Sequence, residues 1–347
     1  MCDPIGLLIY ISMLLLLQVS VMKQNYFILF FAILFVIFIS SFRGDAGVDS
    51  FLYTFRFDSM VSGFEGLKLI EPVEPILPLL MWFIKSLGFD FSIFSLFFGT
   101  IIGYIYFNIL KNYPNAIYFG LTLFPVLFID TLFNGVRIGL AYPLVFLSVL
   151  NSSISLFVIA FFTHISSIIV LPLILLYRKN KIKIIIPIIS LIFFLSFINY
   201  EPIYNRFIVK FFQYQELYTR NFYSGIADSA LLALAITIFL QSRGLKLKSL
   251  ISIIPIIVGI ISILHFMFIS NYVFLLRAVR LLAVIIFAYI AKSNQKINKF
   301  AITACLIFGI FYSLNFLRQI NDSCGYEDNN GFLPLYPKIK NELFGNF

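Results

Sequence analysis

A cluster of charged and small residues, from Arg43 to Asp49, directly follows a long apolar run and is the first place in the chain where chemistry is expected. It holds one arginine, the two carboxylates Asp45 and Asp49, and two glycines within seven residues. Arginine presents fixed donors that match phosphate oxygens. A carboxylate accepts hydrogen bonds from sugar hydroxyls and can serve as a general base. The cluster is a candidate anion and sugar site, although composition alone favours a solvated loop whose charges merely end a helix.

Two further charged residues stand in apolar surroundings. Glu74 precedes Pro75 at the start of an apolar run, where an acid either caps the helix or points a carboxylate into a cavity. Arg137 lies between two apolar runs with almost no polar neighbours. A charged residue in a membrane segment is costly and usually faces a cavity or a partner, although its side chain can also extend to the interface. Both residues are candidates for the site.

The second half of the chain offers an arginine pair and a histidine. Arg277 and Arg280 are spaced i, i+3, which places both guanidinium groups on one helix face, and we expect them to bind an anion. His164 interrupts an apolar run, where a hydrogen-bonded packing role is the simpler interpretation. The sequence has no cluster with metal-ligand spacing and no phosphate loop, GxSxG or HExxH motif, so we predict no metal or other cofactor.

The composition shows which kind of elements must position these residues. Of the 347 residues, 61% are hydrophobic and 12% are charged, whereas a soluble domain is about half apolar and about a quarter charged. A water-soluble fold of this size would need more polar surface than these residues supply. The chain is therefore predicted to be an all-α polytopic membrane protein, and a soluble enzyme, a nucleic-acid-binding domain and a disordered chain are excluded.

Apolar runs that approach the ~20 residues needed to cross a bilayer recur along the whole chain. They predict about 11 to 12 transmembrane helices, some of them short or re-entrant, in a single membrane domain over 1–347. The connections at about 42–73 and 201–227 and the tail at 318–347 are long, external and expected to form interfacial helices. The apolar runs lie at about 5–22, 25–41, 74–88, 91–110, 115–133, 136–150, 153–177, 182–200, 228–241, 250–271, 273–291 and 299–317.

The charges in the connections predict the orientation in the membrane. Three short connections carry ten basic residues and no acid, whereas residues 42–75 hold six acids against three bases. The positive-inside rule therefore places the short basic connections in the cytoplasm and the longer ones outside, together with Arg277 and Arg280. The basic connections lie at about 178–183, 243–248 and 292–299.

Two topologies are open for the first half of the chain. If every run crosses once, Arg137 lies on the cytoplasmic side. Alternatively, 74–88 lies along or dips into the outer face and 153–177 forms a short hairpin broken near His164, which puts Arg137 outside. We favour the second topology because it gathers the chemically capable residues on one side of the membrane.

Four short motifs, in this order, resemble those of the EpsG/Wzy-type polysaccharide polymerases of bacterial membranes. That family carries Arg-x3-Gly-x-Asp-x3-Tyr in its first external loop, a helix opening on Glu-Pro, then Asn-x-x-Arg-Gln-x-x-Ala, and Phe-His-x-Ser before an apolar Leu-Pro run. Here Ile138 replaces the Gln, and Thr163 stands between Phe162 and His164. The resemblance covers roughly residues 25–175. The matching residues are Arg43, Gly47, Asp49, Tyr53, Glu74, Pro75, Asn134, Arg137, Ala141, His164, Ser166, Leu171 and Pro172.

The resemblance implies a GT-C-like membrane glycosyltransferase whose active site faces the extracytoplasmic side of the bacterial cytoplasmic membrane. The donor is then a growing glycan on undecaprenyl diphosphate, and the acceptor is a single repeat unit on the same lipid. The product is O-antigen, capsule or exopolysaccharide. The partners of such an enzyme are these lipid-linked glycans and the bilayer, and a chain-length regulator and a flippase are further candidates. No nucleic acid is expected as a partner.

The chemistry of such a transfer assigns roles to the candidate residues. A diphosphate leaving group needs cationic stabilisation, which arginine supplies where no metal is bound. The acceptor hydroxyl needs a general base. The candidates for the diphosphate and sugar are Arg137, Arg277, Arg280, Arg43, Asp45 and Tyr53, the tyrosine by stacking on sugar rings, and the candidate bases are Asp49, then Glu74, then His164.

Three rival functions remain. A lipid-linked-oligosaccharide flippase should show internal repeats or charges spread through a central passage, whereas the charges here gather at one face. An O-antigen ligase-like transferase differs only in its acceptor, and the resemblance alone separates the two. A membrane acyltransferase has only His164 in its favour, without the neighbouring acid that a histidine-based acyl-transfer site needs.

Overall fold

The computed structural model describes residues 4–43, 50–68, 70, 74–133, 136–164, 167, 226–242, 272–293 and 298–322. Within these ranges the elements are α-helices and one 3-10 turn, and they contain no strand. The protein is therefore an all-α polytopic membrane protein, as the composition predicts. The described helices belong to two compact units, one of residues 1–143 and 297–347 and the other of residues 144–296. The prediction of a single membrane domain stays a prediction.

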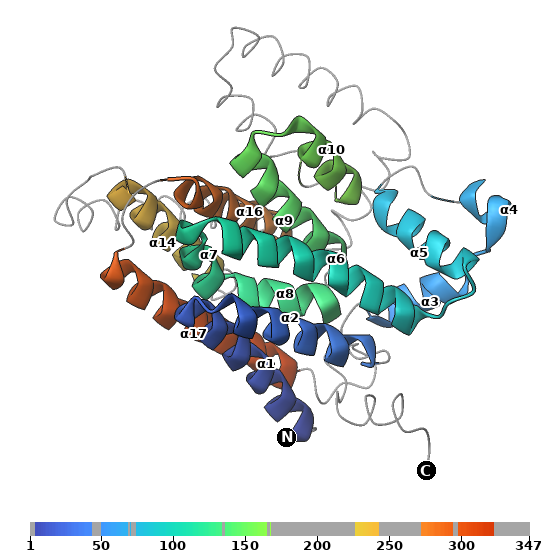
Figure 1. The fold of residues 1–347 in the computed structure, drawn as a ribbon, viewed down its shortest axis with the longest axis horizontal. Helices are drawn as coiled ribbons and strands as arrows, with labels where there is room; N and C mark the ends of the chain where they lie inside the picture. The colour runs from blue at the N-terminus through green and yellow to red at the C-terminus, as the bar shows by residue number, and fades with distance from the viewer. Residues whose placement is uncertain are drawn as a thin grey trace, which may run out of the picture. The chain divides into compact units, whose positions relative to one another are not determined.

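Figure 1 shows the helices in chain order. The first unit begins with α1 (Pro4–Lys23), α2 (Tyr26–Ser41), α3 (Ser50–Asp58), α4 (Gly63–Lys68), α5 (Ile76–Ser86) and α6 (Phe91–Asn112). It continues with η1 (Pro114–Ala116), α7 (Ile117–Thr122), α8 (Phe124–Phe133) and the start of α9 (Val136–Asn151), and it ends with α17 (Lys299–Asp322). The second unit contains the rest of α9, α10 (Ile154–Thr163), α14 (Ile226–Ser242) and α16 (Tyr272–Ala291).

The helix bounds follow the predicted apolar runs closely. Among the described residues, α1 and α6 are each long and apolar enough to cross a membrane. The bent pair Pro114–Thr122 and Phe124–Phe133 makes a third candidate span. Several shorter apolar helices of 10–17 residues accompany them. The predicted total of spans stays a prediction, because the runs at 182–200 and 250–271 lie outside the described residues.

Side-chain caps explain why two of these helices begin where they do. The Asn25 side chain accepts from the backbone N–H groups of Phe27 and Ile28 at the start of α2, at 3.0 and 3.2 Å. Asp90 accepts from the N–H of Ile93 at 2.9 Å at the start of α6. Such caps satisfy donors that the first turn of a helix leaves open. They mark the two helix starts on either side of the segment that carries most of the candidate site.

The centre of the first unit is the broken helix formed by α7 and α8. The two pieces are bent by 58° at a one-residue break, and α8 packs against α1, α2, α6 and α17. Every residue of α8 except Asp130 is buried. A broken helix at membrane depth is tolerated only inside protein or around a cavity. A Cβ on Gly309 of α17 would lie 2.0 Å from the Leu121 carbonyl oxygen, so glycine allows α17 to approach this break.

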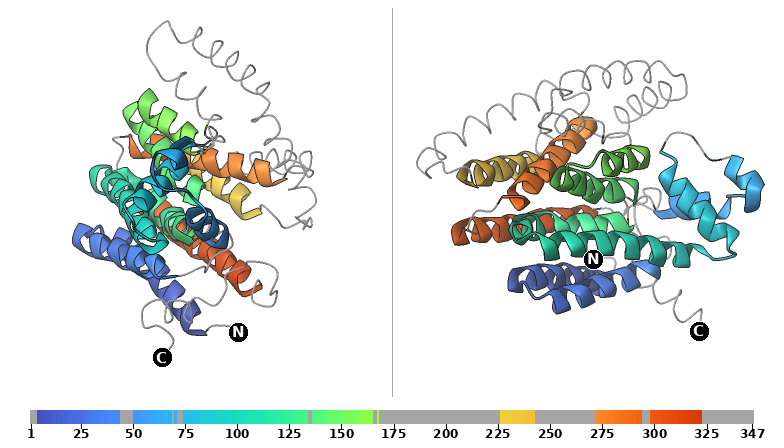
Figure 2. Two further views of the ribbon diagram at one scale, coloured as in Figure 1. Left: turned by 90° about the vertical axis from the view of Figure 1, so that its right-hand side faces the viewer. Right: turned by 45° about the horizontal axis from the view of Figure 1, so that its top comes forward.

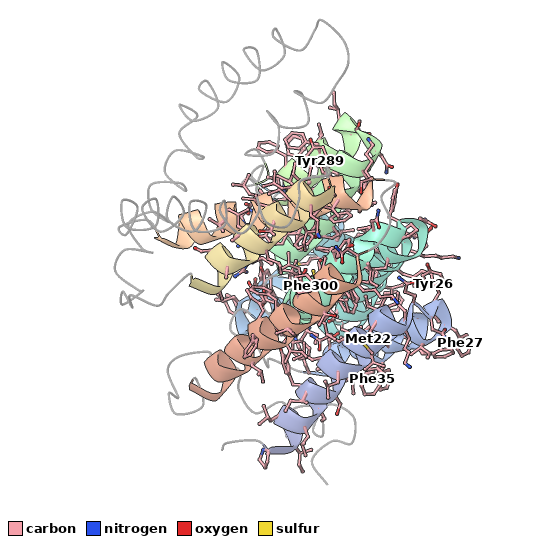
Figure 3. The ribbon with its side chains drawn as sticks, turned by 90° about the vertical axis from the view of Figure 1, so that its left-hand side faces the viewer. Met22, Tyr26, Phe27, Phe35, Tyr289 and Phe300 are labelled. Atoms are coloured by element: carbon pink, nitrogen blue, oxygen red, sulfur yellow. The ribbon has the colours of Figure 1, made fainter. Side chains whose placement is uncertain are left out.

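Helix α2 shows the opposite, lipid-facing character. The helix is apolar on every side, so the face that does not pack is also apolar. Its exposed side chains include Phe27, Phe31, Phe35 and Phe38. Figure 3 shows Phe27 and Phe35 projecting outward from the helix surface. An exposed apolar face of this kind suits lipid, because a bilayer removes it from water. The other face of α2 packs against α1, α6 and α8.

Two uncertain segments of the sequence are resolved in part. The run at 74–88 forms α5, whose 11 residues reach only about 16 Å, so it cannot cross a ~30 Å hydrocarbon core as a straight helix. Within the run at 153–177, α10 ends at Thr163, and His164 has extended backbone angles. Both findings agree with the topology that we favour. Most of the remainder of 153–177 lies outside the described residues.

Candidate functional site

The candidate site is built around Arg137, the second residue of α9. Its Nη1 donates to Oε2 of Glu74 at 2.6 Å, and its guanidinium also donates to the Tyr53 hydroxyl. Tyr53 comes from α3 and Glu74 from the segment just before α5. Three separate segments of the first unit therefore converge on one guanidinium. The residues next to Arg137 in the sequence are apolar, and its polar contacts come from residues distant in the chain.

The backbone explains how Glu74 reaches this position. Glu74 has φ +57, in the left-handed region, which costs a residue other than glycine about 1–2 kcal/mol. Helix α5 starts after Pro75, and no side chain caps it. The ion pair with Arg137 favours the second interpretation of Glu74, a carboxylate that meets a partner, over that of a helix cap. Its side chain turns to Arg137 instead, and the ion pair offsets the backbone strain.

The two partners of the ion pair differ in exposure, and the difference decides what the pair can bind. The Glu74 side chain is 3% exposed, whereas the Arg137 side chain is 24% exposed. The carboxylate is thus enclosed while part of the guanidinium stays accessible. Glu74 and Tyr53 hold the guanidinium in one orientation, and its accessible part can meet an anion without further ordering. This arrangement suits a positioned phosphate ligand.

Tyr53 is buried, with 7% of its surface exposed, and its hydroxyl is a hydrogen-bond partner of Arg137. A ring that stacks on a sugar must present an open face. The geometry therefore favours Tyr53 as a residue that orients Arg137, in place of the predicted stacking on sugar rings. The stacking role itself stays a prediction.

We expect Tyr53→Phe to separate these two roles. The variant keeps the ring and its packing but removes the hydrogen bond to Arg137, and a hydrogen bond to a charged group is worth about 1.5–3 kcal/mol. If the chain has the polymerase activity that the resemblance implies, an orienting role predicts a fall in its rate of about 10-fold or more. A stacking role predicts a rate close to that of the wild type, since phenylalanine stacks as well. Initial rates with purified protein and lipid-linked substrate measure the difference.

Arg43 lies in the same unit as a buried cation. It is 2% exposed, and its Nε donates to the Ser50 hydroxyl at 3.0 Å. Its Nη1 donates to the Ser40 carbonyl at 3.1 Å and to the Ser95 hydroxyl at 3.2 Å. Within the described part of the chain no carboxylate pairs with it. The guanidinium instead lies 5.9 and 5.4 Å from the centres of the Phe91 and Phe133 rings.

These contacts show what Arg43 does in the fold. They join the end of α2, the start of α3 and the first turns of α6, which are the elements around Tyr53. Burial lowers the pKa of Arg43 to about 9, while its neighbour Tyr53 raises it, so the guanidinium remains charged at neutral pH. Because the donors point inward, the geometry favours a positioning role over direct contact with a diphosphate.

The second unit holds another arginine–carboxylate pair. Nε and Nη2 of Arg280 on α16 donate to the two carboxylate oxygens of Asp228 on α14, at 3.0 and 3.2 Å. The Asp228 side chain is 8% exposed and that of Arg280 is 27% exposed. As with Arg137, an enclosed acid fixes a partly accessible guanidinium. Arg277 lies one turn earlier on α16, and its side chain is outside the described residues.

His164 also belongs to the second unit. It ends α10, its backbone N–H bonds to the Ala160 carbonyl, and its own carbonyl accepts from the N–H of Ser167. The residue is 7% exposed, which agrees with a packed histidine. Asp45 and Asp49 lie outside the described residues. Within the described part of the chain no group of three His, Cys, Asp or Glu side chains forms a metal site.

Sequence reasoning named four residues that the structure gathers in the first unit, Arg43, Tyr53, Glu74 and Arg137. It missed the serines that hold Arg43, because serine in a membrane helix carries no distinctive pattern. It also missed Asp228. The signal was present, since Asp228 is an acid at the edge of an apolar run, where an unpaired charge is costly.

Comparisons with known proteins place the chain in a wider group. A family model described as the EpsG family matches residues 26–335. No curated protein and no solved structure matches the chain.

Proposed function

The chain belongs to the EpsG family, and from this premise we propose that it polymerises undecaprenyl-diphosphate-linked repeat units into a surface polysaccharide. Family membership indicates a polysaccharide polymerase-type role in a multi-pass membrane protein. The proposal adds the reaction, its lipid-linked substrates and its location at the outer face of the bacterial cytoplasmic membrane. O-antigen, capsule and exopolysaccharide are the product classes that it includes.

The observation that carries the proposal is the half-enclosed guanidinium of Arg137. The acceptor hydroxyl attacks the anomeric carbon of the donor glycan, and the bond from that carbon to the diphosphate oxygen breaks. The diphosphate leaves as an anion on its lipid, and negative charge develops on it in the transition state. A guanidinium already oriented by Glu74 and Tyr53 stabilises that charge without reorganising.

The proton of the acceptor hydroxyl has to pass to a base. Glu74 is enclosed and engaged by Arg137, so it is a poor choice for that role. Asp49 is the base that we propose; it stands four residues before Tyr53 in the chain. His164 is the remaining candidate. The products are the glycan extended on the acceptor lipid, the free lipid diphosphate and a proton on the base.

Deletion of the gene followed by gel analysis of surface polysaccharide tests the proposal. Loss of a polymerase leaves single repeat units transferred to the final anchor, which is the expected result. Loss of a flippase leaves no transferred units, and loss of a ligase leaves polymer on the carrier lipid. Either of these last two patterns contradicts the proposal. Complementation with the wild-type gene is the control.

A further inference from the structure

The segment between α2 and α6 folds into three short helices, which we call the outer helical module (residues 50–89, as far as they are described). Helices α3, α4 and α5 have 9, 6 and 11 residues. At ~1.5 Å per residue the longest of them, α5, extends about 16 Å, which is little more than half of a ~30 Å hydrocarbon core. Figures 1 and 2 show the three helices gathered beyond the Phe91 end of α6. The module therefore belongs at one surface of the membrane.

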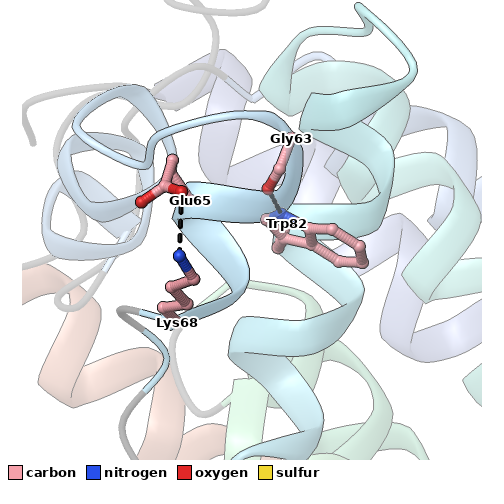
Figure 4. A network of polar contacts seen from close by, with 4 residues as sticks. All are labelled: Gly63, Glu65, Lys68 and Trp82. Atoms are coloured by element: carbon pink, nitrogen blue, oxygen red, sulfur yellow. Dashed lines mark hydrogen bonds and ion pairs between the residues drawn. The ribbon is translucent and has the colours of Figure 1, made fainter.

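Polar contacts between its helices give the module a defined shape. Nε1 of Trp82 donates to the Gly63 carbonyl at 2.7 Å, as Figure 4 shows, and the Gly63 N–H donates to the Ser86 hydroxyl at 3.1 Å. Nζ of Lys85 donates to the Asp58 carbonyl at 3.0 Å. Gly63 has φ +74, a conformation that glycine adopts without strain. These bonds tie the start of α4 and the end of α3 to α5.

Large apolar side chains on this module are exposed, and the Lys68 ammonium lies 5.5 Å from the centre of the Phe64 ring. Phe64 is 72% exposed and Phe55 62% exposed. Leaving such a side chain in water forgoes about 1.5–3 kcal/mol of burial. Buried apolar residues occupy the other faces, for example Phe57 on α3 and Met81 on α5. The exposed set consists of Leu52, Phe55, Val61, Phe64, Phe83, Leu87 and Phe89.

The position of the module in the chain identifies what covers this apolar surface. Phe89 stands two residues before Phe91, the first residue of a candidate membrane span. Exposed apolar side chains thus occur on both sides of the start of α6, Leu87 and Phe89 before it and Ile93, Leu96 and Phe97 after it. Charged side chains occur among the exposed apolar ones, including the ion pair of Glu65 and Lys68 at 2.9 Å, drawn in Figure 4. Apolar and charged side chains side by side suit the boundary between acyl chains and headgroups.

We propose that the outer helical module lies in the plane of the membrane, in the leaflet at the Phe91 end of α6, with its exposed apolar side chains among the lipid acyl chains. The polar backbone ties stay inside the module, and Glu65 and Lys68 meet the headgroups. The seating of the module does not depend on the proposed function. One consequence of the seating does rest on the proposed function. Because the module carries Tyr53 and Glu74, it holds Arg137 at the depth where the diphosphate of a lipid substrate lies.

Depth-dependent fluorescence quenching tests the seating. The background is the full chain with Cys2 and Cys324 replaced by serine and Cys305 by alanine. Single cysteines are placed at Phe64, Phe55 or Leu87, labelled with an environment-sensitive dye and reconstituted into phosphatidylcholine/phosphatidylglycerol vesicles. Glu65→Cys and Ser59→Cys are matched controls, since both positions are exposed and polar and one directly follows Phe64.

The expected result is a blue-shifted emission at Phe64, Phe55 and Leu87. We also expect quenching by acyl-attached spin labels at least 3-fold stronger than at Glu65 and Ser59. Equal lipid quenching at the paired positions Phe64 and Glu65, with equal access to aqueous iodide, overturns the proposal. That outcome identifies a surface for a glycan or a protein partner. The readout requires no enzymatic activity, so a failure of the proposed function and a failure of the seating are distinguishable.

Discussion

Arg137→Gln is expected to abolish long glycan chains, with the largest effect on activity of any single substitution. Removing one preorganised donor to a developing oxyanion costs about 10²–10³ in rate. The same substitution leaves the enclosed Glu74 carboxylate without its cation, and breaking a buried pair costs about 3–5 kcal/mol of stability. Chain-length distribution on gels and thermal unfolding of the purified protein measure the two effects.

The double variant Glu74→Gln/Arg137→Gln separates the effect on activity from the effect on stability. Removing both charges leaves neither partner of this ion pair as a lone charge, so we expect stability to return towards that of the wild type while polymerisation stays absent. Lys111→Gln, on the exposed surface of α6, is a control for loss of one positive charge and should leave chain length unchanged. Normal chains from a well-folded double variant would remove Arg137 from the mechanism.

Arg43→Lys is expected to lower stability strongly although it keeps the charge. A lysine ammonium cannot reproduce the fixed fork that reaches Ser50, Ser95 and the Ser40 carbonyl together. It also loses the guanidinium that lies near both the Phe91 and the Phe133 ring, at 5.9 and 5.4 Å from their centres. We expect a loss of about 2–4 kcal/mol, from the hydrogen bonds to a charged group, visible as a lower unfolding temperature in detergent.

Lys111→Arg is the control for exchanging one cation for the other, because Lys111 is exposed on the surface of α6. A surface substitution of this kind usually changes stability by less than about 0.5 kcal/mol. If Arg43→Lys unfolded at the wild-type temperature but lost activity, Arg43 would contact substrate directly and its positioning role would be wrong. If both variants behaved like the wild type, neither role would stand.

The sequence predicted the helices well because hydropathy and capping are local properties. The run at 25–41 became α2 (Tyr26–Ser41), which starts at its Asn25 cap, and the run at 91–110 became α6 (Phe91–Asn112). The run at 74–88 was too short to be assigned with the same argument. Only the bounds of α5 show that this segment does not cross the membrane as a straight helix.

The sequence predicted which residues belong to the site, but it did not predict which of them contact one another. Arg137 was identified by the cost of an arginine in apolar surroundings, and that cost implied a partner without naming it. The partner, Glu74, is 63 residues away in the chain. Asp228 is 52 residues from Arg280, and its importance was not recognised from the sequence.

The sequence by itself determined the class of the protein, the bounds of most described helices and which charged residues required an explanation. These follow from the apolar content and from patterns that repeat within one helix. The tertiary structure alone decided which acid meets which arginine, that Arg43 points inward, and that Tyr53 is buried against Arg137. Such pairings depend on how helices distant in the chain pack, and no local pattern of residues records that packing.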